Sequence, residues 1–65
     1  MKNYILQFFG FKHLPEGKMQ ETSQLFHNLA HTLDQILPEN PEKTSAMRKL
    51  LEAKDCAVRA HIWED

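Results

Sequence analysis

Apolar side chains recur at helical spacing in two long segments of this chain. In residues 18–37 they are separated by alternating steps of three and four residues, which is typical of the apolar face of an amphipathic helix. Pro38 cannot continue a helix and disfavours helical backbone just before it, so we predict a first long helix over residues 18–37. Its expected apolar stripe consists of Met19, Leu25, Phe26, Leu29, Ala30, Leu33, Ile36 and Leu37.

The second segment, residues 41–63, begins with clear helix signals. Asn40 is a suitable N-cap, Pro41 fits the first helical position, and Glu42 complements the positive end of the helix dipole. The apolar residues that follow form two neighbouring stripes, and one partner helix can cover only one of them. The other stripe needs a second surface, either the N-terminal segment or another subunit. The stripes are Met47, Leu50 and Ala57, and Leu51, Val58 and Ile62.

Residues 1–9 are rich in apolar side chains that should pack on another part of the protein, as a short helix or as an extended arm. Gly10 ends this segment. The loop at residues 38–40 is so short that the two long helices should fold back on each other. We therefore predict an all-α fold in a single domain of residues 1–65, an antiparallel two-helix hairpin with a short N-terminal segment.

The size of the chain favours assembly. A protein of 65 residues buries only about 60% of the surface that its unfolded form exposes, so it usually needs disulfides, a metal or oligomerisation. Cys56 is the only cysteine, which excludes a disulfide within the chain and fits a reducing compartment. We therefore expect a homo-oligomer of hairpins.

The composition argues against several classes of function. The net charge of −1 lacks the basic excess with which a duplex nucleic-acid binder neutralises phosphates. No apolar run approaches about 18 residues, and the N-terminus lacks a signal-peptide cleavage site, so we expect a cytoplasmic protein without a membrane partner. The sequence contains no Gly-rich phosphate loop, nucleophile elbow or paired-cysteine motif, and we expect neither an enzyme nor a cofactor.

Cysteine and histidine are the remaining candidates for site chemistry. We interpret Cys56 as a core residue on a buried helix face, because a reactive thiolate requires cationic neighbours. His27 and His31 are four residues apart, as in some zinc sites, but only Asp34 could act as a third ligand. We therefore predict no metal site and interpret the pair as a polar or interfacial helix face. His61 is expected at an interface.

Aromatic and basic side chains occur together before the first long helix. Phe11 precedes Lys12 and His13, and an aromatic ring stacks on a nucleobase with about 1–3 kcal/mol while nearby cations reach phosphate. The alternative is that Phe11 packs under the hairpin and the two polar side chains are solvated.

A second group of cations lies on the second long helix. Lys43, Thr44 and Arg48 accompany the backbone N–H groups of the helix start, a combination that can bind anions. Arg59 follows Arg48 by eleven residues on nearly the same face. This basic edge suits either a groove shared between subunits or a solvated helix surface.

Three segments resemble a known family. Residues 42–53, continued by residues 56–62, look like the second helix of the phage anti-CBASS cyclic-nucleotide sponges, whose hairpin also occurs in phage sponges that counter the Thoeris defence. Residues 10–14 resemble the aromatic-led connector before the first long helix of those proteins. The resemblance covers residues 10–62.

The resemblance implies a function and a site. Members of that family form hexamers of hairpins and bind cyclic di- and trinucleotides without cleaving them, which withholds the messenger from a host CBASS-type antiviral defence. It implies a homohexamer in the host cytosol, with Phe11 stacking on a base and His27 near the basic position of the first helix. Lys43, Thr44 and Arg59 fall in segments that meet at subunit junctions. The predicted ligand-binding residues are Phe11, Lys12, His13, His27, Lys43, Thr44, Arg48 and Arg59.

The chain departs from the family pattern at four positions that bear on ligand choice and affinity. Cys56 stands where many members have tryptophan, and Leu51 stands where they have an acidic residue. Phe11 replaces a frequent tyrosine, and His27 replaces a permanent cation. The alternative function is a helical protein–protein interaction module whose spare apolar stripe binds a partner helix.

Overall fold

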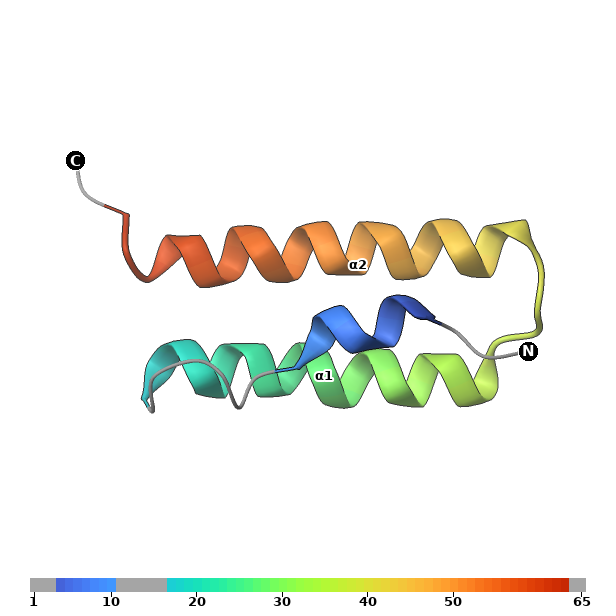
Figure 1. The fold of residues 1–65 in the computed structure, drawn as a ribbon, viewed down its shortest axis with the longest axis horizontal. Helices are drawn as coiled ribbons and strands as arrows, with labels where there is room; N and C mark the ends of the chain where they lie inside the picture. Colours follow the sequence, from blue (N-terminus) through green and yellow to red (C-terminus); the bar gives the residue numbers. More distant parts are fainter. Residues whose placement is uncertain (1–3, 11–16, 64–65) are drawn as a thin grey trace.

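The computed structural model describes residues 4–10 and 17–63. It contains a 3₁₀ helix η1 (Tyr4–Phe9) and two long helices, α1 (Lys18–Ile36) and α2 (Pro41–Ala60). α1 and α2 pack antiparallel, and η1 lies along the pair (Figure 1). The structure thus confirms an all-α hairpin with a short N-terminal segment, and it selects the helical form of that segment.

The turn between the two helices follows the sequence signals. The Leu37 N–H donates to Leu33 O at 2.9 Å, and the backbone of Leu37 then becomes extended, as Pro38 requires. The Asn40 side chain accepts a hydrogen bond from the Lys43 N–H at 2.9 Å, which confirms Asn40 as the N-cap of α2. α1 is therefore one residue shorter than predicted, and α2 begins at the predicted residue.

α2 ends at Ala60, three residues before the predicted end. The His61 N–H donates to Val58 O at 3.1 Å, a tightened last turn. The His61 side chain lies within hydrogen-bond distance of Thr22 in the first turns of α1, with 2.7 Å between Nε2 and Oγ1. α1 begins at Lys18, so a longer α2 would project beyond the helix that covers its apolar face.

Among the side chains that the structure describes, the core contains one fully buried apolar residue from each element: Phe9 of η1, Ala30 of α1 and Met47 of α2. Leu51 also packs here, so part of the second apolar stripe of α2 is covered within the chain. The partly buried residues around this core are Ile5, Leu6, Phe26, Leu33, Leu50 and Leu51.

Part of the predicted stripe of α1 is not buried. Leu25, Leu29 and Ile36 are exposed, whereas the polar residue Ser23 is fully buried. The inward row of α1 follows steps of four and three residues through positions 19, 23, 26, 30 and 33, and the exposed row lies about 100° away at 3.6 residues per turn. The predicted stripe is therefore wider than the face that α2 and η1 cover, because one neighbouring helix covers only one of the two rows.

Two lysines occupy inward positions of α2 that a hydrophobic pattern would not select. Lys43 and Lys54 are both buried. The Lys54 Nζ donates to Phe8 O at 2.7 Å and to Gly10 O at 3.4 Å. A cation favours the carbonyl end of a helix, so Lys54 anchors the end of η1 to α2.

Candidate ligand-binding site

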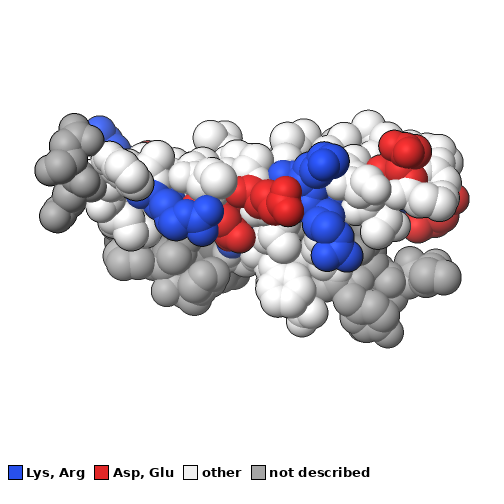
Figure 2. Space-filling view, turned by 90° about the horizontal axis from the view of Figure 1, so that it is seen from above, with Lys and Arg blue, Asp and Glu red and all other residues white. Residues whose placement is uncertain are grey.

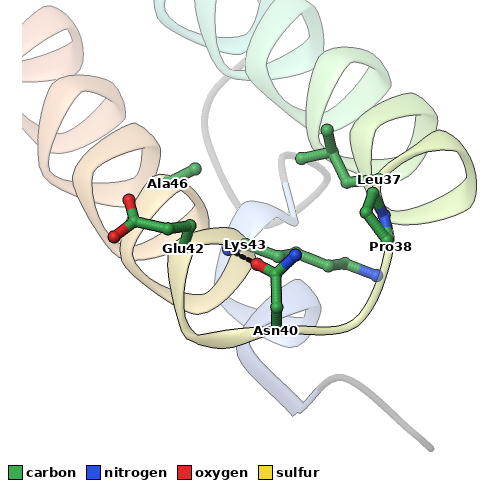
Figure 3. A pocket seen from close by; sticks show the side chains of 6 residues that line it. All are labelled: Leu37, Pro38, Asn40, Glu42, Lys43 and Ala46. Atoms are coloured by element: carbon green, nitrogen blue, oxygen red, sulfur yellow. Dashed lines mark hydrogen bonds between the residues drawn. The ribbon is translucent and has the colours of Figure 1, made fainter.

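The turn between α1 and α2 surrounds the Lys43 ammonium with oxygen atoms. The Nζ atom lies 2.8 Å from Asp34 O, 3.1 Å from Asp34 Oδ1 and 2.5 Å from Glu39 Oε1. The hydrogen bond to Glu39, supported by Asp34, raises the pKa of Lys43 above its ordinary 10.5, while burial opposes this rise. Lys43 crosses from α2 toward the end of α1 (Figure 3) and stabilises the turn; its predicted role in ligand binding stays a prediction.

A hollow of about 410 Å³ lies beside this turn, and we call it the turn hollow. The Asn40 side chain in its wall already caps α2, and the Glu42 carboxylate in the same wall repels an anion. Thr44, predicted as a ligand residue, is exposed outside the hollow. The turn hollow therefore does not suit a phosphate. Its lining residues are Leu37, Pro38, Asn40, Glu42, Lys43 and Ala46 (Figure 3).

The predicted basic edge of α2 carries both signs of charge. Steps of four, three and four residues place Arg48, Glu52, Asp55 and Arg59 on one exposed face. In Figure 2, basic and acidic side chains follow one another along the molecule rather than gathering into one basic patch. The ion pairs found among residues 4–10 and 17–63 all involve Lys43, so the guanidinium groups of this face are not neutralised by those residues.

A second hollow, of about 430 Å³, lies at the C-terminal end of α2, and we call it the C-terminal hollow. Cys56, Arg59, Ala60 and Trp63 line it. It combines an exposed indole ring with a guanidinium group, and these are the groups that stack on a nucleobase and bind a phosphate. Trp63 was not predicted as a ligand residue; its place four residues after Arg59 is the sequence signal that could have indicated it.

Cys56 is exposed, so its prediction as a core residue was wrong. The inward face of α2 includes positions 43, 47, 50 and 54, and Cys56 points away from that face. The Arg59 Nη2 atom lies 3.5 Å from the Cys56 sulfur, within the range of a weak hydrogen bond. Arg59, one turn after Cys56, therefore supplies the cationic neighbour that the sequence analysis did not assign to this thiol.

The two histidines of α1 are in contact. The ring centroids of His27 and His31 lie 4.4 Å apart, with the rings tilted by 49°. His27 is half-buried and His31 is exposed. Asp34, which the sequence analysis considered as a third ligand when it predicted no metal site, pairs with Lys43. Over the described part of the chain, no three His, Cys, Asp or Glu side chains gather into a possible metal site.

The predicted ligand residues do not meet in one pocket of the described hairpin. His27 lies midway along α1, Lys43 and Thr44 lie at the turn, and Arg59 lies at the far end of α2 (Figure 1). Arg48 is exposed between them. Phe11, Lys12 and His13 fall outside the described residues.

The chain was compared with protein families, curated proteins and solved structures, and these comparisons identified no relative. No protein family, curated protein or solved structure matched this chain. Within residues 4–10 and 17–63, neither α1 nor α2 combines the length and apolar character that a membrane-crossing helix needs.

Proposed function

We propose that this chain is a non-catalytic binder that sequesters cyclic di- or trinucleotides and thereby antagonises a CBASS-type antiviral defence in the cytosol of a phage-infected cell. The resemblance of residues 10–62 to the phage sponges suggests the ligand class. The observation that carries the proposal is the C-terminal hollow, where Arg59 and Trp63 lie together on an accessible surface.

The chemistry of this hollow fits a nucleotide better than a purely apolar or purely anionic ligand. Stacking of one base on an aromatic ring contributes about 1–3 kcal/mol. The Arg59 guanidinium has five N–H donors, and its contact with the Cys56 sulfur uses a weak acceptor that a phosphate oxygen would readily replace.

The proposal includes self-association, up to the homohexamer of the family that the chain resembles. The described residues that line the C-terminal hollow are all exposed and lie at one end of the hairpin, so they leave a bound ligand open to solvent on one side. An adjoining hairpin would add further walls. The predicted connector residues Phe11, Lys12 and His13 would complete such a shared site.

A thermal-shift panel of cyclic di- and trinucleotides tests the proposal. A ligand at 100 times its dissociation constant stabilises the native state by about 2.7 kcal/mol, which raises the melting temperature of a domain this small by about 11–22 °C. Arg59→Ala should remove most of the shift. Lys49→Ala is the matched control, because Lys49 is an exposed cation of α2 that lines neither hollow.

Two outcomes of the same experiment would contradict the proposal. The absence of a shift with every cyclic nucleotide would favour a protein-interaction module, since such a module has no reason to respond to the panel. Recovery of linear nucleotide from the denatured complex would indicate an enzyme, whereas a sponge returns its ligand intact.

A further inference from the structure

The C-terminal hollow joins two parts of the chain that the helix geometry of α2 alone does not hold together. Cys56, Arg59 and Ala60 belong to α2, whereas Trp63 follows the last helical residue by three positions. The indole ring stays beside the Arg59 guanidinium as long as residues 61–63 keep one direction relative to α2. The contacts that fix these three residues therefore decide how well the hollow is formed.

The backbone of residues 61–63, which we call the C-terminal turn, is hydrogen-bonded to the end of α2. The His61 N–H donates to Val58 O and the Ile62 N–H donates to Arg59 O, both at 3.1 Å. Bonds between residues three apart are of the 3₁₀ type, and their geometry is poorer than in an α-helix. The side chains add little burial, because Ile62 is 62% exposed and Trp63 is 76% exposed. These backbone bonds restrain the C-terminal turn relative to α2 and not relative to α1.

His61 supplies a contact with α1. Its Nε2 atom lies 2.7 Å from the Oγ1 atom of Thr22, although the two residues are 39 positions apart in the sequence. We call this contact the end clasp. It joins the end of α2 to the first turns of α1 at the open end of the hairpin, where the two helix ends lie side by side (Figure 1). The end clasp thus restrains the C-terminal turn from a second helix.

The chemistry of the end clasp suits a stable contact. A threonine hydroxyl can donate or accept a hydrogen bond, so it pairs with Nε2 in either tautomer of the imidazole. Thr22 is half-buried in a helix, and β-branching restricts its χ1 angle, so little side-chain freedom is lost when the hydroxyl pairs. The direction of the hydroxyl is therefore set largely by α1.

We propose that His61 and Thr22 are positioning residues of the C-terminal hollow, because their contact holds the C-terminal turn so that Trp63 stays beside Arg59. His61 is two residues after Arg59 and two before Trp63, so a restraint at His61 acts on the segment that joins the two ligand groups. Neither His61 nor Thr22 is among the described residues that line the hollow. The inference rests on the proposed function and adds to it the contact that assembles the site.

Fluorescence anisotropy of Trp63, the single tryptophan of the chain, tests the end clasp in the full protein without nucleotide. Thr22→Val keeps the size and branching of the side chain but removes the hydroxyl, and it should lower the anisotropy because the C-terminal turn moves more freely. Thr22→Ser keeps the hydroxyl and should restore the parent value. His61→Ala should match Thr22→Val, and the double variant should show no further loss, since both substitutions break the same contact.

Calorimetric titration with cyclic di-AMP, cyclic di-GMP and cyclic tri-AMP measures the effect on the site. Thr22→Val should weaken the binding of each probe that the parent binds by about 2- to 13-fold, the factor that corresponds to the net contribution of one hydrogen bond.

Two control variants separate positioning from general stability. Thr32→Val makes the same chemical change at an exposed position of α1, and Asn40→Ala destabilises the hairpin at its other end by removing the cap of α2. At a temperature at which every variant keeps the helicity of the parent, both controls should retain the parent anisotropy and the parent affinity.

The outcomes separate the end clasp from the proposed function. Unchanged anisotropy in Thr22→Val, or an equal loss in Asn40→Ala, would overturn the clasp. Lowered anisotropy with unchanged nucleotide affinity would overturn the positioning role and leave sequestration in place. A parent that binds none of the three probes, together with lowered anisotropy in Thr22→Val, would support the clasp and contradict the sequestration of these nucleotides.

Discussion

Phe8 and Phe9 are adjacent phenylalanines in η1, and the structure gives them opposite environments. The Phe9 side chain is fully buried in the core, whereas the Phe8 side chain is 56% exposed to solvent. Phe9 contacts a core whose other fully buried apolar residues are Ala30 and Met47, both small or flexible, so it supplies the largest rigid side chain there. Phe9→Ala should therefore leave a cavity that these neighbours cannot fill.

The expected magnitude is large compared with the stability of the whole chain. Truncating a buried phenylalanine costs about 3–5 kcal/mol. A protein of 65 residues has a total unfolding free energy of about 3–10 kcal/mol. Phe9→Ala should thus remove about a third of the stability or more, and lower the melting temperature by at least about 12 °C.

Thermal and urea denaturation followed by circular dichroism measure this difference. Phe8→Ala is the matched control, because it removes the same atoms from an exposed site and keeps the carbonyl that accepts the Lys54 hydrogen bond. Its cost should stay within about 0.5 kcal/mol. Equal losses for the two variants, or a Phe9→Ala protein as stable as the parent, would refute the assignment of Phe9 to the core.

Four further outcomes follow from the structure and the sequence. Lys54→Met keeps the aliphatic stem but removes a charged hydrogen bond, so it should cost about 1.5–3 kcal/mol in urea denaturation and speed amide exchange in η1. Because the pKa of Lys43 is raised in the folded protein, its stabilising contribution is complete below pH 10.5 and is lost as the pH rises through the folded-state pKa. The melting temperature of the parent should therefore fall more steeply above pH 10.5 than that of Lys43→Met. Asn40→Ala removes the cap of α2 and should cost about 1 kcal/mol, measured as a shift in the urea midpoint. Phe11→Ala should weaken cyclic-dinucleotide binding by about 1–3 kcal/mol in calorimetric titration, with Phe11→Tyr retaining most of the affinity.

The sequence predicted those features of the fold that depend on neighbouring residues. Asn40 and Pro41 start α2 at the predicted place because an N-cap and its first helical residue act within one turn. The end of α2 was missed because it depends on where α1 begins, at Lys18, which is distant in sequence. Long-range packing also decides which of the two adjacent phenylalanines is buried.

The site was less accessible to sequence reasoning than the fold. The pairing of Lys43 with Asp34 could not be predicted from the sequence, because it arises only when the hairpin closes. Cys56 was assigned to the core because its helix face was interpreted as buried and without cationic neighbours, whereas the inward position nearby belongs to Lys54 and Arg59 lies beside the exposed thiol. Trp63 was left out of the predicted site although it follows Arg59 by four residues, and the structure places both in the C-terminal hollow.

The anchoring of η1 by Lys54 has a consequence for mutational tolerance. The acceptors are the main-chain oxygens of Phe8 and Gly10, which every amino acid carries. Substitutions that change only the side chains at positions 8 and 10 therefore leave the anchor intact, whereas any change of Lys54 except to another long cation removes it. A saturation mutagenesis screen for folding should find position 54 far more restricted than its two acceptor positions, so the information for docking the N-terminal segment resides in α2.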